Sequence, residues 1–159
     1  HKMIELPIDE LAYLIRPAGY YNQKAKKLRN FLAWFIESYD GDIAKLKEEP
    51  IEIVRKQLLS IRGIGEETAD SILLYALDKP VFVVDTYTHR ILYRHCIVDE
   101  TMSYKDLQCI FMQNLSPSVP IFKEYHALLV DVGKRFCRRR NPRCDTCPLG
   151  ILPERIIEG

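Results

Sequence analysis

The sequence predicts an all-α protein, a fold class that three observations support. Apolar residues recur every three or four positions along most of the 159 residues, as they do on the buried face of a helix. Segments rich in Gly, Pro and Asp separate these stretches and favour turns. The apolar run at residues 81–84 could form a strand, but a single strand without a partner is not stable. We therefore expect helices joined by turns.

Seven helices are expected from this periodicity. In chain order they are expected at residues 6–15, 22–39, 50–59, 66–77, 86–96, 103–115 and 123–134. The breaks between them are expected at residues 16–19, 40–42, 63–65, 78–80 and 116–120. The second helix has an inward stripe, opposite a lysine-rich face, formed by Leu28, Phe31, Leu32 and Phe35. Glu67 suits the first turn of the fourth helix, and Asp85 can cap the fifth.

Charge and hydropathy narrow the function classes. The formal net charge is +1, from 23 basic and 22 acidic residues, so composition alone does not indicate a nucleic-acid partner. The charge is uneven, however, because residues 134–143 contain six Lys or Arg and no acid. No segment approaches the roughly 18 apolar residues of a membrane span, and the first residues lack the layout of a signal peptide. We expect a cytoplasmic protein with a local basic surface that contacts phosphate.

Two glycines, Gly63 and Gly65, separate the third and fourth expected helices. A turn with this spacing lets the backbone approach a ligand closely, and the N–H groups that begin the next helix suit a phosphate. An ordinary turn between two helices would explain the same residues. The Gly-Ile-Gly sequence is therefore a candidate phosphate site that needs further support.

A single carboxylate, Asp85, follows the apolar run at residues 81–84. Removing a carboxylate from water is costly unless it is paired, hydrated or used in a reaction. Asp85 could cap the helix that starts at Thr86, or it could take part in catalysis. The two roles are compatible.

These features combine into a longer pattern. Its central part consists of Leu59, Gly63, Ile64, Gly65, Thr68 and Ala69, followed by an apolar helix and then by Val84, Asp85 and Thr86. Residues 19–25 read GYYNQKA, and residues 126–147 read HALLVDVGKRFCRRRNPRCDTC. Together they resemble the endonuclease III superfamily of DNA glycosylases, in which a helix-hairpin-helix precedes a Gly/Pro-rich loop and an aspartate. The resemblance covers about residues 17–149.

The resemblance implies a helical DNA glycosylase fold with a helix-hairpin-helix motif and a C-terminal cysteine loop. Residues 1–96 would form part of a helical barrel, with the hairpin at about 58–77 and the catalytic Asp loop at 78–86. Residues 97–159 would hold the C-terminal helices and a basic cysteine loop at 137–147. The implied partner is double-stranded DNA with a damaged base. The implied DNA contacts are Gly63, Ile64, Gly65, Glu66, Thr68, Arg138, Arg139, Arg140 and Arg143.

By resemblance, Asp85 is the catalytic aspartate of a base excision repair enzyme. A fixed carboxylate stabilises the positive charge that builds on the sugar as the base leaves, and it can orient or deprotonate the attacking water. Bifunctional family members place a lysine where this chain has Glu67, and glutamate cannot form the imine that precedes strand cleavage. Lys56 and Lys79 are conceivable substitutes. We expect a monofunctional glycosylase without AP-lyase activity.

Within the superfamily, residues 16–26 and 63–76 look most like the branch of 3-methyladenine DNA glycosylases. A purine alkylated at N3 or N7 already carries positive charge, so one carboxylate suffices to release it. Aromatic rings would hold such a base by stacking and cation–π attraction, and the pocket candidates are Tyr21 and Glu67. The alternatives are a glycosylase for mismatched or deaminated bases, a relative that binds DNA without chemistry, and a structural metal-loop protein.

Three of the five cysteines, Cys137, Cys144 and Cys147, lie within eleven residues, which favours a metal over disulfides in an intracellular chain. Their spacing is similar to that of the family's [4Fe–4S] loop. The fourth cysteine of that loop would fall at Pro153, so a [4Fe–4S] cluster, zinc and no metal all stay open. Cys96 and Cys109 are expected to be small buried hydrophobes.

Family members carry a longer N-terminal region with a polar residue that wedges into the DNA stack. The chain starts at His1 instead of Met, so we expect it to be N-terminally incomplete. The histidines on helices, His89, His95 and His126, are expected to be structural. The resemblance also implies a monomer that works at the nucleoid in the cytoplasm.

Overall fold

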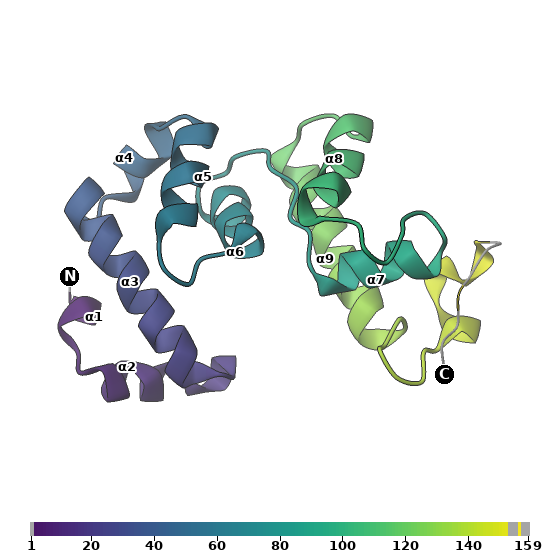
Figure 1. Ribbon diagram of the computed structural model, residues 1–159, viewed down its shortest axis with the longest axis horizontal. Helices are drawn as coiled ribbons and strands as arrows, with labels where there is room; N and C mark the ends of the chain where they lie inside the picture. Colours follow the sequence, from purple (N-terminus) through teal and green to yellow (C-terminus); the bar gives the residue numbers. More distant parts are fainter. Residues whose placement is uncertain (1, 153–155, 157–159) are drawn as a thin grey trace. The chain divides into compact units, whose positions relative to one another are not determined.

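The computed structural model describes residues 2–152 and residue 156, and the chain folds into helices joined by short connections (Figure 1). The α-helices are α1 (Lys2–Glu5), α2 (Ile8–Leu14), α3 (Tyr21–Tyr39), α4 (Ile43–Glu48), α5 (Ile51–Ser60), α6 (Glu66–Ser71), α7 (Thr86–Arg94), α8 (Tyr104–Asn114) and α9 (Val119–Arg135). The 3-10 turns are η1 (Arg16–Ala18), η3 (Cys144–Thr146) and η4 (Pro148–Ile151), and η2 (Ile72–Ala76) is a π-helical turn. No strand occurs among the described residues, so the predicted all-α class is confirmed.

The chain forms two compact units, His1–Leu73 and Leu74–Gly159. The boundary falls inside the π-helical turn that follows α6. The sequence instead predicted a division by expected function, with the hairpin and the Asp loop before residue 97 and the cysteine loop after residue 96. That functional division stays a prediction. Within the described ranges, none of the helices combines the length and the apolar character needed to cross a membrane.

Several predicted boundaries were wrong for physical reasons. The last long helix begins at Val119 and includes Pro120, because the first turn of a helix needs no N–H donor from its own residues. The helix expected at residues 66–77 changes to a π-helical turn after Ser71. The short helices α1 and α4 escaped prediction because a helix of one or two turns shows too few periods.

The predicted burial of Cys96 was also wrong. The helix α7 ends at Arg94, and Cys96 lies beyond it, exposed and in the left-handed region with φ of 55°. A residue in a turn after a helix end no longer faces the core, so its apolar character does not bury it. Cys109, within α8, is half-buried.

In the first unit, α2 packs against α3 around Leu11, Ala12 and Ala25, which are buried. The predicted inward stripe of α3 is half-buried, and its aromatic rings contact one another, with Phe31 and Phe35 stacked at 5.7 Å between centroids. These contacts hold α3 in place beside the connection between α5 and α6, where the Asn30 side chain donates to the carbonyl of Arg62 at 2.8 Å.

A buried ion pair fixes α5 to α6, the two helices that flank Gly63 and Gly65. Arg55 donates from Nε to Oδ1 of Asp70 at 2.7 Å and from Nη2 to Oδ2 at 3.0 Å. Asp70 is fully buried, and its hydrogen bonds to Arg55 hold the pKa of that guanidinium above its usual range. A bidentate pair of this kind sets both the spacing and the angle of the two helices.

In the second unit, the apolar run Val81–Val84 is buried without regular structure. Side chains of α8 satisfy the backbone of Phe82 in this run. Gln108 donates to the carbonyl of Phe82 at 2.6 Å, and the N–H of Phe82 points to the sulfur of Met112 at 3.4 Å. The ring of Phe82 stacks on Phe111 of α8 at 3.9 Å between centroids. The run is therefore a fixed, buried segment that leads directly to Asp85.

The helices α7 and α9 pack together in the second unit. The backbone of Gly133 on α9 lies so close to Tyr87 of α7 that an added Cβ would stand 2.5 Å from the ring. Glycine permits this close approach because it has no side chain. As a result, the start of α7 lies against the last turn of α9.

Candidate functional site

Asp85 lies where the buried run ends and α7 begins. Its Oδ1 accepts a hydrogen bond from the N–H of Thr88 at 2.8 Å and another from the Thr88 hydroxyl at 2.9 Å. Thr88 is fully buried, and the Asp85 side chain is only 10% exposed. The predicted capping role of Asp85 is therefore confirmed, and it uses one of the two carboxylate oxygens.

The second oxygen of Asp85 faces a histidine on α9. Nε2 of His126 lies 3.6 Å from Oδ2 of Asp85, and the imidazole is 13% exposed. The other ring nitrogen, Nδ1, lies 2.7 Å from the hydroxyl of Tyr75 in the π-helical turn. Asp85, His126 and Tyr75 thus form a row of three polar groups within the second unit.

Burial and partners act on the pKa of Asp85 in opposite directions. Burial alone would raise the pKa, but the imidazole of His126 and the two donors of Thr88 outweigh it and hold the pKa below the usual value of 3.8. At 3.6 Å the contact with His126 is longer than a hydrogen bond, so its effect is electrostatic. Burial and the charge of Asp85 together raise the pKa of the Tyr75 phenol. At neutral pH, Asp85 is therefore ionised and Tyr75 keeps its proton.

The sequence analysis missed His126 because it treated isolated helical histidines as structural. A signal was nevertheless present on α9. Phe122, Leu129 and Gly133 are buried at helical spacing, and His126 occupies the same face between them. A polar residue on the inward stripe of an amphipathic helix requires an explanation.

The predicted hairpin residues lie in the first unit, in the turn between α5 and α6. Gly63 has φ of 97°, and a Cβ there would stand 2.7 Å from Lys27, whereas a Cβ at Gly65 would meet nothing within 4 Å. Gly65 is the N-cap of α6 and has no side-chain capping bond. Ile64 is buried, and the neighbouring candidates Glu66, Glu67 and Thr68 are exposed. The backbone at Gly65 is thus open to a ligand.

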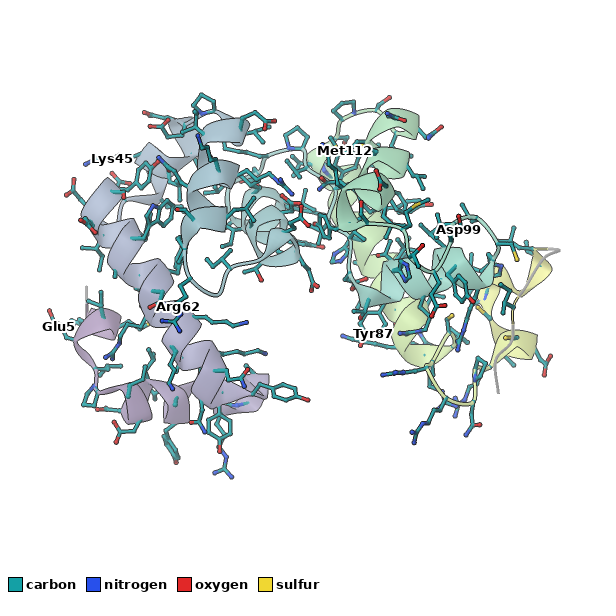
Figure 2. The ribbon with its side chains drawn as sticks, in the orientation of Figure 1. Glu5, Lys45, Arg62, Tyr87, Asp99 and Met112 are labelled. Atoms are coloured by element: carbon teal, nitrogen blue, oxygen red, sulfur yellow. The ribbon has the colours of Figure 1, made fainter. Side chains whose placement is uncertain are left out.

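A basic groove adjoins this hairpin. It has a volume of about 610 Å³, and its lining includes four cations and no acid: Lys26, Lys27, Arg29 and Arg62. Figure 2 shows Arg62 beside α3, which supplies the other three cations. Sequence patterns did not join these residues because α3 and the hairpin are distant along the chain. Tyr21, a predicted pocket residue, instead packs at the start of α3 against Leu11 and Ala25.

The predicted basic loop lies in the second unit, where Arg139, Arg140 and Arg143 are exposed. Two arginines of α7 hold the loop through its carbonyl groups. Arg90 donates to Cys137 at 2.7 Å, and Arg94 donates to Arg138 at 2.7 Å. Arg138 is half-buried and donates to the carbonyl of Asn141 at 3.0 Å. Arg139 and Arg140 also line an open groove of about 1070 Å³ that runs along α7 past Thr86 and His89. These contacts fix the base of the loop, and the side chains of Arg139, Arg140 and Arg143 stay exposed to solvent.

Cys137, Cys144 and Cys147 line one small cavity together with apolar side chains and His95. Soft thiols on one cavity are the donor type that iron–sulfur clusters and zinc prefer. Among the residues that the structure describes, however, no three metal-binding side chains converge on one point. Pro153, at the expected place of a fourth ligand, lies outside the described residues. The thiols are therefore of the type that a metal prefers, but the described residues do not arrange three of them around one point.

Comparison with known proteins identifies the family. Residues 1–117 match the HhH-GPD superfamily of base excision DNA repair proteins, and the chain belongs to this family. It is 47% identical over 150 residues to the Methanocaldococcus jannaschii protein MJ1434, whose own assignment as a DNA repair glycosylase is provisional; the match covers 93% of this chain and 67% of that protein.

Two solved structures are similar to this one. A trapped covalent intermediate of endonuclease III with DNA matches with a TM-score of 0.75 and 26% identity, over 96% of this chain and 67% of that chain. A 3-methyladenine DNA glycosylase of H. pylori bound to 1,N6-ethenoadenine matches with a TM-score of 0.70 and 29% identity, over 84% and 66%. The chain spans only 60% to 62% of the endonuclease III proteins of Bacillus subtilis, Sulfolobus acidocaldarius and Thermotoga maritima.

Proposed function

We propose that this chain carries the catalytic part of a monofunctional DNA glycosylase that releases an alkylated purine from double-stranded DNA. One observation supports the proposal most directly. Asp85 is ionised and nearly buried, its Oδ1 is fixed by Thr88, and its Oδ2 makes no hydrogen bond to any described residue. A carboxylate of this kind is available to a reacting group.

The reaction places positive charge on the deoxyribose as the bond from C1′ to the base nitrogen lengthens. A carboxylate that is already ionised and fixed stabilises this charge without reorganisation. The lowered pKa makes Asp85 a weak base, which suits a substrate whose leaving group is already cationic and needs little help to depart. Electrostatic stabilisation is therefore the main role of Asp85, and accepting a proton from water is secondary.

The alkylated purine is supported by the residues at 16–26 and 63–76 and by the likeness to the H. pylori 3-methyladenine glycosylase. That protein binds 1,N6-ethenoadenine, a purine with an added ring. For the base pocket we keep Tyr21 and Glu67 as candidates within the first unit. Mismatched and deaminated bases are the competing substrates.

The proposed absence of strand cleavage is supported by the lack of a free lysine amine where the family's imine-forming lysine stands. Glu67 occupies the position of the family's imine-forming lysine and carries no amine. Near Asp85 along the row of polar groups, the ammonium of Lys123 lies 2.7 Å from Asp78 and 5.9 Å from the centroid of the Tyr75 ring. Both contacts engage the amine of Lys123, so it is not placed as a free nucleophile. Borohydride should therefore trap no covalent adduct with DNA.

The hairpin and the basic loop would hold the DNA backbone. Gly63, Ile64 and Gly65 would present backbone N–H groups to one phosphate, with Glu66 and Thr68 beside them, and Arg138, Arg139, Arg140 and Arg143 would contact others. Cys137, Cys144 and Cys147 would hold an iron–sulfur cluster or zinc, whose part would be to fix the shape of this loop. Iron and zinc analysis of protein purified without air tests whether these cysteines bind a metal. Protein that contains neither iron nor zinc would contradict a metal site.

The deciding experiment measures base release from alkylated duplex DNA by the full-length natural protein. We expect free 3-methyladenine, with strand breaks appearing only after alkali. Release from mismatched or uracil-containing DNA instead would change the substrate class. Tight, salt-dependent binding without release from any of these substrates would identify a DNA-binding relative without chemistry.

A further inference from the structure

The two oxygens of Asp85 have different surroundings, and the difference defines where a reactant can bind. Oδ1 accepts two hydrogen bonds from Thr88, which occupy both of its lone pairs. Oδ2 has the imidazole of His126 as its nearest polar neighbour, at 3.6 Å. A reacting molecule that uses Asp85 must therefore approach Oδ2, on the side where His126 lies.

The two nitrogens of His126 also differ. Nδ1 lies 2.7 Å from the hydroxyl of Tyr75, a good hydrogen bond, whereas Nε2 is buried and has no hydrogen-bond partner among the described residues. A buried ring nitrogen without a partner is costly unless another molecule satisfies it. Nε2 is thus a binding group that the fold itself leaves unsatisfied.

The charge of Asp85 determines which nitrogen carries the proton. A lone pair on Nε2 would face the carboxylate at 3.6 Å and repel it, so the ring is expected to carry its proton on Nε2. Nδ1 then accepts the hydrogen bond, and the Tyr75 hydroxyl donates it. The raised pKa of Tyr75 keeps that donor protonated. The Tyr75 hydroxyl therefore stabilises the tautomer that the charge of Asp85 favours.

From this geometry we infer that Nε2 of His126 and Oδ2 of Asp85 together hold the water that attacks C1′, with Tyr75 as the positioning residue. Two atoms 3.6 Å apart are too far for a direct hydrogen bond, yet both can lie at hydrogen-bonding distance from one water molecule. Because Nε2 has almost no accessible surface in this structure, the water enters only when the side chains that cover Nε2 move aside. The water would accept from Nε2–H and donate to Oδ2, which aims a lone pair at the sugar. This inference rests on the proposed function, because it assigns the nucleophile of the same site.

The bonds and charges of this step balance. A lone pair of the water forms the new bond to C1′, and the bond from C1′ to the purine nitrogen breaks with its electrons staying on the base. An alkylated purine that was cationic leaves as a neutral molecule. The proton that the water loses passes to Oδ2 of Asp85 and then to solvent. His126 keeps its proton throughout and serves as a donor.

The groups that face this site come from three elements. His126 faces Asp85 from α9, and Tyr75 faces it from the π-helical turn. Lys123 pairs with Asp78 at 2.7 Å, and its ammonium lies 5.9 Å from the centroid of the Tyr75 ring. Of these, His126 has the strongest effect on the pKa of Asp85 after burial. Removing His126 should therefore raise the pKa of Asp85 and shift the acid limb of the pH–rate profile to higher pH.

The experiment compares His126→Leu, His126→Gln and Tyr75→Phe in the full-length natural protein, with Glu124→Gln on the exposed face of α9 as the matched control. Single-turnover base release is measured across pH and in mixtures of water and methanol, which compete as nucleophiles. We expect His126→Leu to slow release about 100-fold, to shift the acid limb upward and to change the methanol-to-water product ratio. His126→Gln can still donate and should recover much of the rate, and Tyr75→Phe should fall between wild type and His126→Leu.

Asp85→Asn separates this inference from the proposed function. If Asp85→Asn is inactive while His126→Leu matches the control in rate, pH profile and product ratio, the water site is wrong and the proposed function stands. If Asp85→Asn releases bases as fast as wild type, the proposed function itself is wrong. Equal salt-dependent DNA binding and equal melting temperatures exclude misfolding as the cause, and a slow His126→Leu with an unchanged product ratio would also overturn the water site.

Discussion

Two buried aspartates, one in each unit, show how differently the fold uses the same side chain. Asp70 in the first unit is fully buried, and both of its oxygens are taken by Arg55 at 2.7 and 3.0 Å. Asp85 in the second unit has one oxygen held by Thr88 and the other facing His126 beyond hydrogen-bonding distance. Burial alone therefore does not mark a reactive carboxylate. The distinguishing feature is an oxygen that the fold leaves without a donor.

The partners differ in the same way. Arg55 always carries its charge and forms a complete bidentate pair, so the Asp70 region can only join α5 to α6. His126 has one ring nitrogen that faces Tyr75 and another that faces Asp85. Unlike a guanidinium, a neutral imidazole can accept a hydrogen bond at one nitrogen and donate at the other. We therefore expect substitutions at Asp85 to affect activity and substitutions at Asp70 to affect stability.

The substitution Asp85→Asn is expected to have the largest effect, a loss of base release. Asparagine can still cap α7 through its carbonyl oxygen, so the fold should persist. It has no charge to stabilise the sugar cation, and base release should fall by about 1000-fold or more. Single-turnover assays and DNA binding should be measured together. Unchanged release would remove Asp85 from the mechanism, and lost binding would show that the substitution damaged more than chemistry.

The second expected effect is on stability, from Asp70→Asn. The substitution removes the buried charge that pairs with Arg55 and leaves exposed Glu66, 3.5 Å from Arg55, as its other carboxylate partner. We therefore expect a cost of about 3 kcal/mol in the free energy of unfolding, at the low end for breaking a buried pair. Urea unfolding followed by circular dichroism would measure it. Exposed Asp131, which pairs with Arg135 at 3.2 Å, offers a matched control: Asp131→Asn should cost less than about 1 kcal/mol. Similar losses for both variants would contradict the structural role of Asp70.

The two glycines of the hairpin in the first unit are expected to respond differently to substitution by alanine. Gly63→Ala should cost about 1–2 kcal/mol, because alanine is strained at φ of 97° and its Cβ meets Lys27. Gly65→Ala should change stability by less than about 0.5 kcal/mol, since its Cβ enters open space. That same methyl group would block a phosphate, so DNA affinity should fall for Gly65→Ala. If affinity is unchanged at matched salt, the backbone at Gly65 does not contact DNA.

The sequence predicted the helical class and the place of Asp85, because periodicity and capping are local signals that short windows contain. It did not predict His126 or Arg55 as partners. Tyr75 and His126 are 51 residues apart, and Arg55 and Asp70 are 15 apart, so only packing brings them together. The prediction that Cys96 is buried was wrong for a related reason, because burial at this position depends on where α7 ends. Local patterns therefore singled out Asp85 as a candidate but not the groups that surround it.

The smallest expected effect is the pH dependence of stability that Asp85 contributes. Its pKa is lower in the folded chain than the usual 3.8, so the folded state favours the ionised form. The resulting stabilisation is fully present above pH 3.8 and is lost as the pH falls through the lowered folded value. The difference in unfolding free energy between wild type and Asp85→Asn should therefore be constant near neutral pH and should shift against wild type on acidification. A shift in the opposite direction would mean that burial outweighs His126 and Thr88, and that Asp85 is protonated more readily than a carboxylate in water. The comparison with Asp70 would then fail, because Asp85 would be a neutral buried acid and not a charged group held ready for the substrate.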